Sequence, residues 1–107
     1  MIENMLTQDT SHLEEALIEN MVEAIRFDID YHCFWHRIAR PEDCQIDYNL
    51  YERIQIARDK GHAIYSPQLR RRVFSILFIK GTIRNHELFD IAMDRFKYRL
   101  NLCSKSQ

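Results

Sequence analysis

Apolar residues recur every three or four positions along most of this chain, and that spacing places them on one face of an α-helix. The first such stretch covers residues 11–40, where one side of a helix collects Leu17, Met21, Ala24, Ile25, Ile29 and Trp35. The opposite side collects the charged residues Glu15, Glu19, Glu23, Arg26, Asp30 and Arg37. This separation of apolar from charged positions predicts a long amphipathic helix.

Local signals indicate where this first helix begins and ends. Ser11 and Glu14 have the spacing of a capping box, in which the hydroxyl and the carboxylate bind two otherwise unpaired backbone N–H groups. Pro41 disfavours a helical conformation for Arg40, so the helix is predicted to end there. Residues 1–9 are predicted to form a loose lead-in.

A second helix is predicted over residues 42–60. Pro41 suits the first position of a helix, and the acids Glu42 and Asp43 suit the positive end of the helix dipole. The apolar stripe of this helix comprises Ile46, Leu50, Tyr51, Ile54 and Ala57. Gly61 follows the stripe and is a suitable C-cap.

A third helix is predicted over residues 67–80, because Ser66 is a favourable N-cap and Pro67 fits the first helical position. The second half of this segment is apolar on nearly all sides, which predicts a central element covered by its neighbours. Residues 73–79 are also compatible with a buried strand. The flanking caps and the lack of a partner strand favour the helix.

A fourth helix is predicted over residues 83–102, with Thr82 or Asn85 as its cap and a frayed tail at 104–107. Its main apolar stripe comprises Phe89, Ala92, Met93, Phe96, Leu100 and Cys103. A narrower stripe on the opposite side comprises Ile91, Arg95, Tyr98 and Leu102, with the arginine interrupting the apolar residues. A four-helix monomer would leave this second stripe in contact with water.

These elements define an all-α, single-domain fold over residues 1–107, a four-helix antiparallel bundle with short connections. The chain has only two glycines and two prolines, which is typical of long helices rather than a turn-rich β architecture. We expect neither a membrane span nor a secretory signal. Three cysteines without a paired spacing favour a reducing, cytoplasmic setting.

Polar residues interrupt the apolar face of the first helix. Asp28 and His32 lie near its centre, four residues apart, and His36 follows at its edge. If the first two helices form an antiparallel hairpin, His36 also approaches Asp47, which lies near the centre of the second apolar face. Buried polar groups cost free energy unless they are paired, so this cluster requires an explanation.

Three interpretations of this polar cluster remain open. The first is a structural network in which each histidine pairs with a carboxylate and a tyrosine hydroxyl. The second is a metal site, since His32 and His36 have the i, i+4 spacing of two ligands on one helix. The third is a partner-binding groove with Phe34 and Trp35 as its aromatic anchors. We favour the structural network and assign no metal, cofactor or catalytic residue.

The net charge of −1 hides a strong asymmetry between the two halves of the chain. Residues 1–52 contain twelve acids and three bases, whereas residues 53–107 contain four acids and twelve bases. The halves either neutralise each other within one folded unit or form a dipolar surface that steers a partner or a second copy.

No catalytic motif is found, so we expect a non-enzymatic protein that works by binding another protein, as an adaptor, inhibitor, chaperone or accessory subunit. Homodimerisation through the second stripe of the fourth helix is an equal possibility. A metal- or His/Asp-dependent activity at the polar cluster is the alternative. Nucleic-acid binding through the basic second half ranks third, because the sequence pI of 6.5 is far from that of a basic domain.

Overall fold

The computed structural model describes the backbone of residues 2–30 and 46–105, with side-chain environments for residues 14–30 and 46–103. Its helices are α1 (Ile2–Asp30), α2 (Tyr48–Asp59), α3 (Pro67–Ile79) and α4 (His86–Lys105). The described residues contain no strand. The predicted all-α class is therefore confirmed, and the segment 73–79 is helical.

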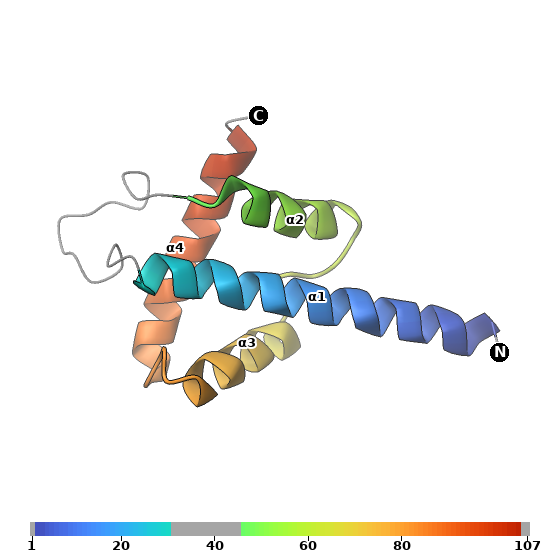
Figure 1. Cartoon of the computed structure of the whole chain (residues 1–107), viewed down its shortest axis with the longest axis horizontal. Helices are drawn as coiled ribbons and strands as arrows, with labels where there is room; N and C mark the ends of the chain where they lie inside the picture. The colour runs from blue at the N-terminus through green and yellow to red at the C-terminus, as the bar shows by residue number, and fades with distance from the viewer. Residues whose placement is uncertain (1, 31–45, 106–107) are drawn as a thin grey trace.

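The long helix α1 is the element around which the others pack. It contacts α2, α3 and α4, and α2 also contacts α4. Figure 1 shows α2 running beside α1 in the opposite direction, as expected for consecutive helices, whereas α4 runs across this pair. The N-terminal part of α1 extends beyond the other helices.

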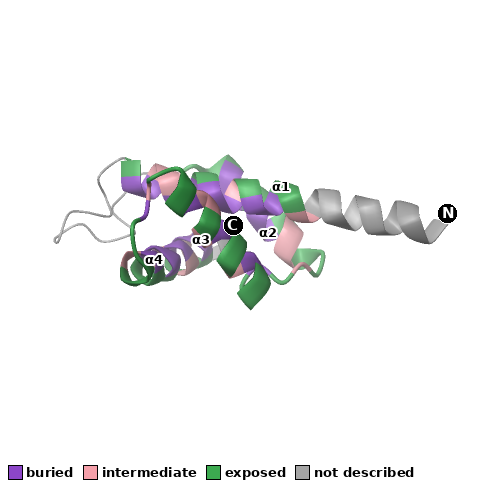
Figure 2. Ribbon diagram, turned by 90° about the horizontal axis from the view of Figure 1, so that it is seen from below, coloured by how far each residue is buried: buried purple, intermediate pink, exposed green. Residues whose placement is uncertain are grey.

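The buried positions follow the apolar stripes that the sequence predicts. All six residues of the main α4 stripe are buried, and so are Leu17, Met21, Ala24, Ile25 and Ile29 of α1. The α2 stripe buries Leu50, Tyr51 and Ile54, while Ile46 and Ala57 are partly buried against the same core. Ile64 and Ile83 complete the core from the two connections. Figure 2 shows the buried faces turned toward one another.

The start of α1 differs from the prediction. The helix already includes residues 2–10, so the loose lead-in predicted for 1–9 is wrong from Ile2 onward, and Ser11 and Glu14 lie inside the helix. The physical reason is that this stretch contains neither proline nor glycine, and nothing in it stops the helix from continuing toward the N-terminus. The predicted end at Arg40 lies outside the described residues.

The start of α2 is also corrected. Asp47 is not helical: its φ of −83° and ψ of 93° are extended, and its side chain accepts a hydrogen bond from the Leu50 N–H. Asp47 is therefore the N-cap, and the helix begins at Tyr48 rather than at residue 42. Pro41, the start that the sequence suggested, lies outside the described residues.

The caps predicted at Ser66 and Asn85 are confirmed, although α4 begins at His86, three residues after the predicted start at 83. The Ser66 hydroxyl accepts a hydrogen bond from the Leu69 N–H at 3.2 Å, and the Asn85 side chain accepts one from the Leu88 N–H at 2.9 Å. Gly81 follows α3 with a φ of 76°, a left-handed conformation that residues with a Cβ rarely adopt. The α4 backbone continues to Lys105, three residues beyond the predicted end.

The position of α3 is a further correction, because it is not a central element covered on several sides. Its face with Leu69, Val73 and Leu77 is buried, yet Phe78 is 53% exposed and Ile79 is 82% exposed. Apolar residues around the whole circumference of a short helix do not ensure burial when only one side meets neighbours.

The difference in exposure between Leu77 and Ile79 of α3 gives a matched test of the fold. Leu77→Ala is expected to lower the free energy of unfolding by about 2–5 kcal/mol, because it leaves a cavity in the core. Ile79→Ala, two residues away in the same helix, is expected to change it by no more than about 0.5 kcal/mol. Chemical denaturation of both variants measures the difference, and equal losses would show that the end of α3 is covered.

Candidate functional site

The most unusual feature of the core is a buried carboxylate that faces α4. Asp28 of α1 is 5% exposed. Its two carboxylate oxygens accept hydrogen bonds from Arg95, from Nε at 2.8 Å and from Nη2 at 3.1 Å. This two-point pairing fixes the guanidinium plane against the carboxylate and joins α1 to α4.

A second arginine lies deeper beside the same carboxylate. Arg99 is 1% exposed, its Nη1 lies 3.8 Å from Asp28 Oδ1, and its Nε donates a hydrogen bond to the Tyr51 hydroxyl at 3.3 Å. Tyr51 belongs to α2, so the group joins three helices. We call Asp28, Tyr51, Arg95 and Arg99 the ion cluster.

A buried amide reinforces the same interface. The Gln55 side chain of α2 donates a hydrogen bond to the Leu100 carbonyl oxygen of α4 at 3.1 Å. Within the described part of the chain, no buried side-chain nitrogen or oxygen lacks a hydrogen-bond partner. The polar groups between α2 and α4 are therefore fully satisfied, as expected of a structural network.

Burial favours the neutral forms of two titratable groups, Tyr51 in the ion cluster and Cys103 near it. Burial raises the pKa of Tyr51 to about 12, although the Arg99 guanidinium opposes this change. Burial also raises the pKa of the Cys103 thiol, again against the effect of Arg99. A thiol with a raised pKa is a poor nucleophile, so neither group is prepared for nucleophilic chemistry.

The predicted polar cluster is only partly realised. Asp28 is buried as expected, but the described residues that pair with it are arginines of α4. The Tyr51 hydroxyl joins the network through Arg99, whereas the expectation paired a tyrosine hydroxyl with a histidine. Asp47 is exposed and caps α2, so its predicted place at the centre of a buried face is wrong. His32 and His36 lie outside the described residues.

The arginine partners are the part of this site that the sequence interpretation missed. The sequence pattern places Arg95 on the outer stripe of α4 and gives no special position to Arg99. Their i, i+4 spacing at the edge of the main apolar stripe was the available signal, because it presents two cations to the same neighbouring helix.

The described residues offer no metal centre. No three histidine, cysteine, aspartate or glutamate side chains among them are placed to hold a metal ion. Both oxygens of Asp28 already accept hydrogen bonds from Arg95, so this carboxylate would have to leave its arginine partner to act as a ligand.

The predicted protein-binding residues of α4 form a partly exposed face. Ile91 is 46% exposed and Tyr98 is 45% exposed, while Leu102 is half-buried. Arg95 lies on the same face, but its guanidinium turns inward to Asp28. Phe34 and Trp35, the other predicted anchors, lie outside the described residues.

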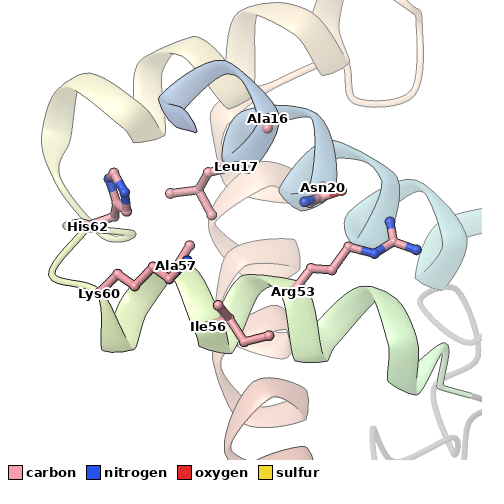
Figure 3. Close-up of a pocket in the computed structure, with 8 residues that line it drawn as sticks. All are labelled: Ala16, Leu17, Asn20, Arg53, Ile56, Ala57, Lys60 and His62. Atoms are coloured by element: carbon pink, nitrogen blue, oxygen red, sulfur yellow. The ribbon is translucent and has the colours of Figure 1, made fainter. Parts of the chain in front are cut away.

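A groove between α1 and α2, which the sequence did not reveal, is shown in Figure 3. Its volume is about 230 Å³. The apolar part of its lining consists of Ala16, Leu17, Ile56 and Ala57. The polar part consists of Asn20, Arg53, Lys60 and His62.

Ion pairs connect the acidic first half of the chain to the basic second half. Arg72 of α3 pairs with Glu15 of α1, in addition to the two arginines on Asp28. The opposite charges thus neutralise each other in part within the folded unit. None of the described helices is long and apolar enough to cross a membrane.

Comparison with known proteins gives no further guide to the site: no family model, no curated protein and no solved structure matches this chain.

Removing the buried carboxylate tests the ion cluster. Asp28→Leu is expected to lower the free energy of unfolding by about 3–5 kcal/mol, because it leaves the buried Arg99 without a counter-charge. Asp90→Leu is the control, since the pair of Asp90 with Arg70 is exposed and contributes at most about 1 kcal/mol. Adding Arg99→Met to Asp28→Leu should restore at least half of the loss. Equal losses in the two single variants would contradict a buried role for Asp28.

The raised pKa of Tyr51 predicts a pH dependence. The unfolded chain releases the phenol proton near pH 10, whereas the folded protein retains it until about pH 12, so stability falls as the pH rises between these values. Tyr51→Phe is expected to flatten this fall, and Tyr98→Phe is the matched exposed control. Denaturant unfolding at several alkaline pH values measures the slope, and an unchanged slope in Tyr51→Phe would refute the assignment.

Proposed function

We propose that this chain works by binding another protein through the outer face of α4, as an adaptor, inhibitor, chaperone or accessory subunit. The observation that carries this proposal is the exposure of Ile91 and Tyr98, each close to half exposed, on the helix whose opposite face is fully buried. We call Ile91, Tyr98 and Leu102 the α4 stripe.

The spacing of the α4 stripe gives it the form of a contact surface. Positions 91, 98 and 102 are separated by seven and four residues, so the three side chains lie above one another on one helix face. Tyrosine is one of the residue types that most often dominate binding energy at protein interfaces.

The ion cluster supports the proposal because it holds α4 rigidly beneath the stripe. Arg95 lies between Ile91 and Tyr98 in sequence, and its guanidinium is fixed on Asp28. Tyr51 also stacks on Phe96 of α4, with ring centroids 5.8 Å apart. A preorganised surface loses less conformational entropy on binding than a flexible one.

The partner is either a different protein or a second copy of this chain. A second copy would cover the α4 stripe by pairing two identical faces around a two-fold axis. Sedimentation of the purified protein separates the two cases, because only the second gives a dimer without any added partner.

The double variant Ile91→Ser/Tyr98→Ser tests the function. It is expected to weaken partner or dimer binding by roughly thirtyfold or more, because each central apolar contact contributes about 1–2 kcal/mol or more. Quantitative affinity purification from the native host and sedimentation measure the loss. The fold should be retained, since both side chains point outward.

The matched control is Ile79→Ser/Tyr48→Ser, which removes the same two residue types from exposed positions on other helices. It should leave the binding unchanged. A wild-type protein that is monomeric and recovers no partner, or equal binding by the two double variants, would contradict the proposal.

A further inference from the structure

The groove between α1 and α2 is too small for a typical metabolite. Its volume is about 230 Å³, below the roughly 300–1,000 Å³ of small-molecule sites. Leu17 and Ala57 form an apolar surface between the two helices (Figure 3). The size and lining fit one large apolar side chain rather than a whole ligand.

The rim of the groove carries two basic side chains. Arg53 and Lys60 both line the groove, and neither forms an ion pair with a residue that the structure describes. His62 lies at the opposite end from Arg53 (Figure 3). No acid is found among the described lining residues.

Three acids of α1 lie toward α3 rather than toward the groove. Glu15 pairs with Arg72 of α3, and Glu19 and Glu23 line the hollow between α1 and α3. Glu15, Glu19 and Glu23 therefore lie on the α3 flank of α1, whereas Arg53 and Lys60 line the groove on the α2 flank. The α2 flank favours a negatively charged partner.

We propose that this groove is a second docking site, which binds an acidic segment of a partner protein. One large apolar side chain of that segment packs on Leu17 and Ala57, and carboxylates beside it contact Arg53 and Lys60. The proposal rests on protein binding as the function, but it does not depend on the α4 stripe.

Synthetic twelve-residue peptides test this site directly on the whole chain. Each carries one central leucine, phenylalanine or tryptophan flanked by glutamates, and a matched series carries lysines instead. In NMR titrations to about 1 mM, the glutamate series should shift the amide signals of Ala16, Asn20 and Ala57. The lysine series should bind at least roughly tenfold more weakly.

Two variants separate the charge from the cavity. Arg53→Glu/Lys60→Glu is expected to weaken peptide binding by roughly tenfold, whereas Arg71→Glu/Arg84→Glu, the same change at exposed positions away from the groove, leaves it unchanged. Ala16→Leu fills the groove from an exposed helical position and should abolish binding without a change of charge.

Several outcomes overturn the proposal. These are no shift with any glutamate peptide, equal binding of the lysine series, or binding that the groove variants do not alter. If hexanoate alone binds as tightly as the peptides, the site takes a small carboxylate instead. If the groove variants abolish self-association, the occupant is a second copy. A negative result in the peptide titrations does not contradict binding through the α4 stripe, because Ile91→Ser/Tyr98→Ser is assayed separately against the native partner.

Discussion

The arrangement of this protein depends on one buried carboxylate that serves two arginines. Asp28 accepts both hydrogen bonds of Arg95 and lies 3.8 Å from Arg99, which is itself almost inaccessible to solvent. Burying an ion without its partner costs several kcal/mol. A shift or rotation of α4 would therefore leave at least one buried charge unpaired. Tyr51 adds a further condition, because its hydroxyl accepts a hydrogen bond from Arg99 only when α2 lies in register with both other helices. We infer that these charges specify the crossing of α4 over α1 and α2, while the apolar core supplies most of the stability.

The same helix arrangement determines which residues are exposed on the two proposed docking surfaces. Because the arginines face inward, the outer face of α4 presents Ile91 and Tyr98 on a rigid helix. Glu15, Glu19 and Glu23 of α1 lie toward α3, and the groove on the other flank of α1 is bordered by Arg53 and Lys60. The two proposed docking surfaces therefore differ in chemistry: one is mainly apolar, and the other combines an apolar floor with a basic rim. Binding a partner at both would combine the affinity of an apolar contact with the specificity of a charged one.

The candidate site was predictable only in part. Asp28 was recognisable because an acid at the centre of an apolar face is anomalous, and the need for a partner followed from the cost of burying it. Its arginine partners could not be found from the local pattern, because Arg95 and Arg99 come from a helix more than sixty residues away. The misplacement of Asp47 has a local cause. An aspartate that precedes a helix binds a free backbone N–H, but if the helix is extended to include Asp47, the residue falls on the apolar face. The exposed end of α3 and the groove left no signal in the sequence pattern, because exposure depends on which neighbours are present.

The sequence by itself determined the helical class, the cap at Ser66, and which faces of α1, α2 and α4 are buried. It reduced the cap of α4 to Thr82 or Asn85, and the structure has Asn85. These features follow from hydrogen bonds within a few residues and from a 3.6-residue period, so they require no knowledge of distant segments. Only the tertiary structure decided that α1 is the central helix, that Asp28 faces α4, and that a basic groove opens beside α2. Those features depend on how helices cross, and helix crossing is set by packing and charge pairing between positions far apart in the chain.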